Sequence, residues 1–148
     1  MTVTVIGSVY SSAHQPGDFG WMIKHASYDD ALFVFNDNEA QYKLHRDDPT
    51  AAGGCQAGGG NAGIRPHQCE TPPRAAGVPT GPGYDTLTPA VQAIVDEAVG
   101  AIGKIVAANG YQRVFFSADA NGDLGTHIFH VGNDVKAYIV KSLKALGN

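Results

Sequence analysis

Short polar residues follow an apolar run in the first half of the chain. Asn36, Asp37 and Asn38 come directly after residues 31–35, which are apolar at every position. Carboxylate and amide groups held at the end of a strand can hydrogen-bond a ribose, an amide or a base edge. An Asx turn that caps a short helix would use the same residues, and the two roles are compatible. We therefore predict a ligand-binding role for all three residues.

A glycine-rich turn forms the second candidate element. Gly58, Gly59 and Gly60 precede Asn61, and Arg65 follows shortly after. Successive main-chain N–H groups in such a turn can converge on a diphosphate, and a guanidinium can add a pair of hydrogen bonds. No lysine follows the glycines, and the strand-turn-helix setting of the dinucleotide fingerprint is missing. We predict an anion-binding loop, with a structural clamp as the alternative role for Arg65.

A polar loop after residues 113–117 supplies the third element. It begins with Ser117 and Asp119, and its glycines Gly122 and Gly125 would let a ligand approach the backbone closely. Thr126 adds a hydroxyl group. The Asp-Ala-Asn-Gly-Asp sequence resembles the start of a calcium loop, but its glycine is out of place and the glutamate at the twelfth position is missing. We predict a ligand loop without a metal.

Histidines and cysteines are the residues that could form a metal site or a catalytic pair. His45, Cys55, His67 and Cys69 are residue types that bind zinc, but their spacing is irregular and contains no Cys-x-x-Cys pair. A cysteine–histidine catalytic pair lacks a third group that would orient it. We expect neither a metal nor a cofactor. The sequence leaves open whether the two cysteines are free, paired or metal-bound.

Composition limits the partners. The chain has 148 residues, of which 43% are hydrophobic and 16% are charged, as expected for one globular domain. A net charge of -4 argues against broad binding to DNA or RNA, which needs a basic face. No run approaches the ~18 apolar residues of a membrane span, and the N-terminus has no secretion signal. We expect a cytoplasmic protein without a membrane partner.

The elements that must position these residues suggest an α/β domain over residues 1–148. Residues 2–10 and 21–25 are predicted to be strands that form an antiparallel hairpin, an extension over residues 1–30. Its exposed edge could pair with a second copy, so a homo-oligomer is possible. Residues 31–35 are expected to form a central strand buried on both faces.

The rest of the chain is predicted to alternate helices with one more strand. Asn38 should cap a short helix, and the segment 47–83 is predicted to be a long, ordered Gly/Ala/Pro-rich ligand loop, with a disordered insert as the alternative. Thr88 and Asp134 should each cap an amphipathic helix, with a strand at residues 113–117 between them. The fold class is therefore a single α/β domain with a mixed sheet and flanking helices.

Four motifs resemble those of the macrodomain-like proteins of bacteria and phages. They are Leu-Phe-Val-Phe-Asn-Asp-Asn at 32–38, Gly-Gly-Gly-Asn-Ala-Gly-Ile-Arg at 58–65, Gly-Val-Pro-Thr-Gly at 77–81, and Leu-Gly-Thr at 124–126. Asn36 stands where the related pattern has glycine, and Gly81 where it has lysine. The resemblance implies a macrodomain-like fold that binds ADP-ribose or a related nucleotide and in some members hydrolyses ADP-ribosyl bonds.

The resemblance also implies roles for individual residues. Asp37 and Asn38 would contact the base or ribose, Gly58 to Asn61 the proximal ribose and diphosphate, and Leu124 to Thr126 the second side of the phosphates. The complete expected ligand set is Asn36, Asp37, Asn38, Gly58, Gly59, Gly60, Asn61, Arg65, Thr80, Ser117, Asp119, Gly122, Leu124, Gly125 and Thr126.

Our main hypothesis is a pocket at the strand carboxyl ends that binds ADP-ribose or another NAD-derived or cyclic nucleotide. One alternative is a phage protein that sequesters a nucleotide immune signal without catalysis. A second is an ADP-ribosyl glycohydrolase, in which Asp37 or Asp119 would activate a water. A third is a structural or assembly protein that uses the Gly/Ala/Pro segment as a contact surface.

Overall fold

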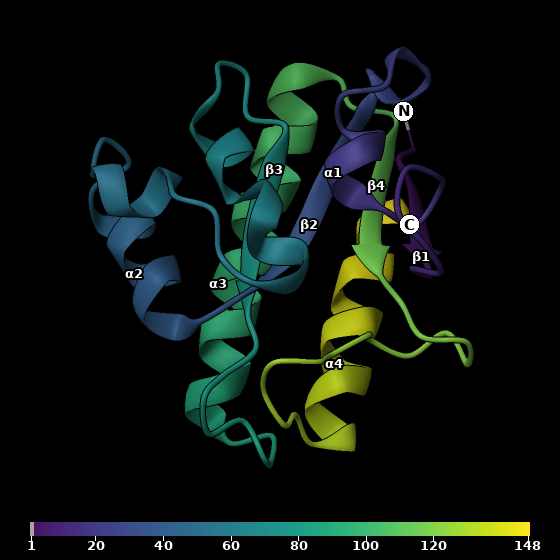
Figure 1. The fold of residues 1–148 in the computed structure, drawn as a ribbon. Coiled ribbons are helices and arrows are strands. Elements are labelled where there is room, and N and C mark those ends of the chain that lie inside the picture. Colours follow the sequence, from purple (N-terminus) through teal and green to yellow (C-terminus); the bar gives the residue numbers. More distant parts are fainter. Residues whose placement is uncertain (1) are drawn as a thin grey trace.

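A four-stranded parallel sheet organises the protein, which a computed structural model describes over residues 2–148 (Figure 1). The strands are β1 (Thr4–Ser8), β2 (Ala31–Asp37), β3 (Ala75–Pro79) and β4 (Arg113–Ser117), in the spatial order β1-β4-β2-β3. The α-helices are α1 (Phe19–Met22), α2 (Glu39–Asp47), α3 (Pro89–Asn109) and α4 (Asn133–Lys144). Short 3-10 segments are η1 (Ala26–Tyr28), η2 (Ala52–Cys55), η3 (Gly60–Cys69) and η4 (Ala145–Gly147).

β2 is a central strand, as its continuous apolar sequence predicted. It pairs in parallel with β3 on one side and with β4 on the other. All of its residues are buried except Asn36, which is half-buried. A strand with neighbours at both edges and apolar layers on both faces can carry hydrophobic residues at every position.

The alternating side chains of β2 belong to two separate cores, one on each face of the sheet. Leu32 and Val34 pack with α3 and α4, whereas Phe33 and Phe35 pack with α1 and η3. The rings of Phe33 and Phe115 stack at 5.2 Å on the second face. Figure 1 shows α1 on the opposite side of the sheet from α3 and α4. The sheet is therefore the middle layer of three, and the predicted α/β domain with flanking helices is confirmed.

The predicted N-terminal hairpin is wrong. Residues 21–25 form no strand, because the Asp18 carboxylate accepts the N–H groups of Gly20 and Trp21 and so starts α1. β1 instead joins the main sheet, where it lies parallel to β4. The sheet is consequently parallel over the described residues and not mixed. β1 is an edge strand, and any pairing between copies through this end of the sheet would involve β1.

The segment 47–83 is more regular than the predicted ligand loop. It contains η2, η3 and the strand β3, which is buried at every position. The Ala-Ala-Gly-Val-Pro sequence of β3 has no polar alternation and few β-branched residues, so the usual strand signals are weak. The helix after Thr88 has its predicted cap, but α4 begins after Gly132, so Asp134 lies in its first turn and is not its cap.

No helix within residues 2–148 is both long enough and apolar enough to cross a membrane. The burial of the edge strand β3 can be tested with two glycine substitutions. An ideal Cβ at Gly77 would lie 3.0 Å from Asp37 Oδ2 and 3.0 Å from the Phe35 ring, whereas one at Gly100 on α3 meets no atom within 4 Å.

We expect Gly77→Ala to lower the free energy of unfolding by about 1–3 kcal/mol, because the added methyl overpacks a buried strand. Gly100→Ala should raise it by about 1 kcal/mol, because alanine favours an exposed helical position. Urea denaturation measures both values. Equal, small effects at the two positions would show that residues 75–79 are a loop and not a packed strand.

Candidate functional site

A cavity of about 790 Å³ lies at the carboxyl ends of the parallel strands. Asn36 near the end of β2, Ser117 at the end of β4 and Thr80 directly after β3 all line it. From β2 the chain continues to β3 at one edge, and from β3 it crosses back over β2 to reach β4. Crevices at such a reversal of strand order are where open parallel sheets bind ligands.

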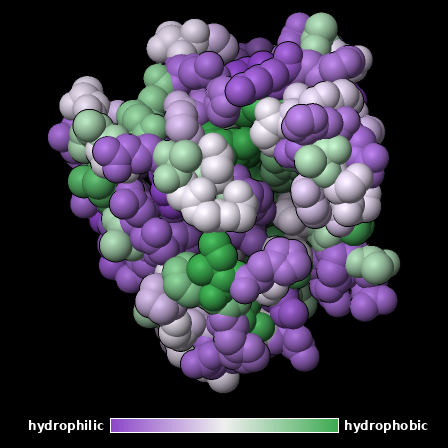
Figure 2. Space-filling view, viewed as in Figure 1, coloured by the Kyte–Doolittle hydropathy of each residue, from purple (hydrophilic) through white to green (hydrophobic). Residues whose placement is uncertain are grey.

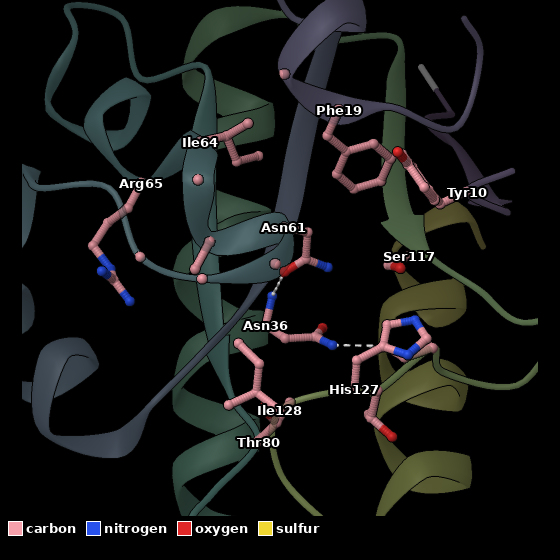
Figure 3. A pocket seen from close by; sticks show the side chains of 18 of the residues that line it. Tyr10, Phe19, Asn36, Asn61, Ile64, Arg65, Thr80, Ser117, His127 and Ile128 are labelled. Carbon is pink, nitrogen blue, oxygen red and sulfur yellow. Dashed lines mark hydrogen bonds between the residues drawn. The ribbon is translucent and has the colours of Figure 1, made fainter. Parts of the chain in front are cut away.

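Two hydrogen bonds from Asn36 join the three predicted segments at this cavity. Its main-chain N–H donates to Asn61 Oδ1 at 2.8 Å, and its side-chain Nδ2 donates to the carbonyl oxygen of Gly125 at 2.7 Å. Figure 3 shows Asn36 between Asn61 and His127, with the side chain of Ser117 nearby. The end of β2, the glycine-rich turn and the loop after β4 therefore meet around one space.

The glycine-rich turn lines the cavity with Gly58, Gly59, Gly60 and Asn61. Gly58 N–H donates to the Ala62 carbonyl, and Ala62 N–H donates to the Gly59 carbonyl, which fixes the turn. Gly60 has a φ of 60°, a conformation that glycine adopts without a steric penalty. η3 begins at Gly60, and the first N–H groups of a helix have no partner within it. The amides of Gly60 and Asn61 thus have no partner within η3, and both residues line the cavity.

Arg65 is a structural clamp in this structure, the alternative that the sequence left open. Its Nη2 donates to Asp37 Oδ1 at 2.6 Å, and its Nη1 donates to the Gln56 carbonyl at 3.1 Å. The side chain of Arg65 is only 6% exposed and that of Asp37 only 1% exposed. An ideal Cβ at Gly58 would lie 2.6 Å from Arg65 Nη1, so a larger residue there would displace the guanidinium from its present position.

The ion pair is incompletely satisfied. Asp37 Oδ2 and Arg65 Nε are buried and have no hydrogen-bond partner among the described residues. Burial raises the pKa of the Asp37 carboxyl, and the hydrogen bond and charge of Arg65 lower it by less. Burial also lowers the pKa of the neighbouring His45 imidazole, an effect that the charge of Asp37 partly offsets. The Asp37 carboxylate therefore depends on Arg65 to remain charged in the interior.

Apolar side chains form two walls of the cavity. Phe19 from α1, Ile64 from η3 and Tyr10 lie to one side of Asn61 in Figure 3, and Ile128 lies to the other side. Phe129 joins Ile128 as a lining residue. Figure 2 shows a hydrophobic patch on this face at the place where the segment after β4 crosses in Figure 1. The site thus combines apolar walls with a few convergent polar groups, as small-molecule sites do.

Most of the residues expected to bind a ligand line the cavity. These are Asn36, Asn38, Gly58, Gly59, Gly60, Asn61, Arg65, Thr80, Ser117, Gly125 and Thr126. Several of them also have structural roles: Asn38 Oδ1 caps α2 by accepting the Gln41 N–H, as predicted, and the Thr80 hydroxyl donates to the Asp37 carbonyl.

Four expected residues do not line the cavity. Asp37 is buried in the clamp, and Leu124 belongs to the hydrophobic core. The Asp119 carboxylate accepts the N–H groups of Asn121 and Asp123, so it shapes its own turn. Gly122 lies in that same exposed turn. Neither Asp37 nor Asp119, the two expected catalytic carboxylates, faces the cavity.

Eleven lining residues were not in the expected ligand set. They are Tyr10, Gly17, Asp18, Phe19, Gly20, Ala62, Gly63, Ile64, His127, Ile128 and Phe129. The first five were assigned to the hairpin, although Asp18 directly before a glycine-flanked aromatic residue is a helix-capping signal. Ile128 and Phe129 form an apolar pair in a polar loop, which is a signal of burial or contact.

The two cysteines form a disulfide between η2 and η3. Cys55 and Cys69 therefore cannot bind zinc, and no cluster of three or more potential metal ligands occurs in residues 2–148. The covalent loop encloses Gly58 to Arg65, the entire glycine-rich part of the cavity lining. Disulfides persist mainly in oxidising compartments, so this bond does not support the cytoplasmic location expected from the sequence.

Comparisons of the chain with models of known protein families, with curated proteins and with solved structures gave no match.

Replacement of Arg65 tests the clamp. We expect Arg65→Met to lower the free energy of unfolding by about 3–5 kcal/mol, because it leaves the buried Asp37 carboxylate without its partner. The double variant Asp37→Asn, Arg65→Met should lose less than the sum of the two single losses, as measured by chemical denaturation.

The exposed pair of Arg46 and Glu97 offers a matched control, since Glu97→Gln removes an ion-pair partner at the surface and should change stability little. If Arg65→Met were as stable as Glu97→Gln, Arg65 would not be a clamp.

Proposed function

We propose that the protein binds ADP-ribose or a related NAD-derived or cyclic nucleotide in the cavity at the strand carboxyl ends. The observation that carries this proposal is the pair of hydrogen bonds from Asn36, which bring a glycine-rich turn and two strand ends around one cavity. A volume of about 790 Å³ accommodates a ligand of nucleotide size. This function agrees with the one that the macrodomain resemblance implies.

The chemistry of the lining matches the parts of such a ligand. The amides of Gly60 and Asn61 suit a phosphate group, because first-turn N–H groups and the helix dipole both favour an anion. The aromatic ring of Phe19 offers an apolar surface for a base. Hydroxyl and amide groups on Ser117 and Asn36 can hydrogen-bond a ribose.

Binding without hydrolysis is favoured over a glycohydrolase. The Asp37 carboxylate is paired with Arg65, and the Asp119 carboxylate accepts a hydrogen bond from the main chain of its own turn. Neither carboxylate is therefore placed to activate a water beside the ligand. Sequestration of a nucleotide signal needs only the binding groups. Residues 58–65 also argue against a structural or assembly protein that uses this segment only as a contact surface, because they line a cavity.

A carboxylate placed in the glycine turn tests the binding site. We expect ADP-ribose at one hundred times its dissociation constant to stabilise the wild-type protein by about 2.7 kcal/mol, seen as a rise in Tm. Gly59→Glu should abolish that rise, because the exposed Gly59 has ordinary backbone angles and the new side chain would repel a phosphate.

Gly100→Glu is the matched control, since it adds the same charge on the exposed face of α3. It should retain the full ligand-induced rise in Tm. If ADP-ribose, NADH and cyclic dinucleotides all leave the wild-type Tm unchanged, the proposed function is wrong.

Recovery of the ligand separates binding from hydrolysis. After incubation with the protein and release by heating, the nucleotide should elute unchanged in chromatography, because neither expected catalytic carboxylate faces the cavity. A hydrolysed product that forms with the wild-type protein but not with Gly59→Glu would instead identify an enzyme acting at this site.

A further inference from the structure

Two exposed apolar side chains lie on opposite sides of the cavity. Ile128 is 63% exposed and Tyr10 is 57% exposed, the highest values among large hydrophobic residues in the described chain. Both line the cavity, and Figure 3 shows them on either side of Asn61. Exposed side chains of this size at the rim of a site gain most from a ligand that covers them.

The glycine turn lies between these two apolar groups. An ideal Cβ at Gly59 would be 3.1 Å from Ile128 Cδ1, so the isoleucine lies directly beside the main chain of the turn. An ideal Cβ at Gly81 would lie 2.9 Å from the Phe129 ring. The Phe129 ring therefore packs against the main chain of Gly81, which holds this aromatic side chain in place in the wall. Phe19, 4% exposed, is the fixed aromatic residue of the other wall.

The charges around the cavity favour an internal phosphate linkage over a terminal phosphate. Arg65 is the only lysine or arginine among the described lining residues, and its guanidinium is already paired with Asp37. Asp18 adds a carboxylate to the lining. Each phosphate of an internal linkage carries one negative charge, so a diphosphate linkage spreads two charges over two groups, whereas a single terminal phosphate carries about 1.5 to 2 at neutral pH. Main-chain amides alone match the smaller charge per phosphate better.

From these observations we propose that the ligand has two ring systems joined through a diphosphate, that is, a dinucleotide. This inference rests on the proposed nucleotide-binding function and deepens it. One ring binds against Phe19 and Tyr10, the diphosphate binds at the amides of Gly60 and Asn61, and the second ring covers Ile128 and Phe129. The second apolar wall is thus a subsite for the far end of the ligand.

NADH and ADP-ribose form a matched pair of probes, because they share the adenosine diphosphate portion and differ by one dihydronicotinamide ring. We expect isothermal titration calorimetry of the wild-type protein to show NADH binding about fivefold more tightly than ADP-ribose. Ile128→Ala should remove most of this difference, because it should weaken the binding of NADH more than the binding of ADP-ribose. The substitution is at an exposed side chain, so the fold should be retained.

Leu44→Ala is the control. Leu44 is an exposed residue on α2 with the same side-chain composition as isoleucine, and it does not line the cavity. It should preserve the preference for NADH. Equal affinities of the wild-type protein for the two probes, or an equal loss of both with Ile128→Ala, would overturn the second subsite while the nucleotide-binding function stands. If the wild-type protein binds neither probe and no cyclic dinucleotide, both the second subsite and the nucleotide-binding function are overturned.

Discussion

The buried ion pair between Asp37 and Arg65 holds the glycine turn against the end of β2. A carboxylate and a guanidinium removed from water are each costly, and their mutual attraction offsets that cost only when the geometry is good. The contact is short, yet each partner keeps one polar atom without a hydrogen bond. Such a pair is better suited to fixing one arrangement of the chain than to adding stability. Here it fixes where Asn61 meets Asn36.

The parallel sheet determines where that arrangement can bind a ligand. All four strands point the same way, so the polar residues that follow β2, β3 and β4 gather at one edge. The apolar faces of the sheet are fully used by the two cores, which leaves this edge as the place where backbone groups remain open. Segments distant in the sequence then complete the cavity: α1 supplies Phe19, and the loop after β4 supplies Ile128. The fold and the cavity thus follow from the same strand direction.

The sequence predicted those elements of the fold that are determined by residues close together in the chain. The apolar run of β2 and the Thr-Pro start of α3 are examples, because burial periodicity and capping are encoded within a few residues. The same reasoning predicted that Asn36 and Asn61 belong to one site. It missed β3, whose small residues form a strand only because β2 offers an edge to pair with. It also placed Phe19 in a hairpin and left open whether Arg65 binds a ligand or acts as a clamp, because the partner of a side chain elsewhere in the chain leaves no local signal.

The disulfide between Cys55 and Cys69 has a consequence for the entropy of the glycine-rich segment. Glycine gives a chain more backbone freedom than any other residue, and that freedom must be lost when a segment takes up a single shape. A covalent crosslink removes many of the alternative shapes in advance, above all from the disordered chain. The glycine-rich stretch is therefore tethered near both ends, and a ligand that binds to it meets a surface already close to its final form.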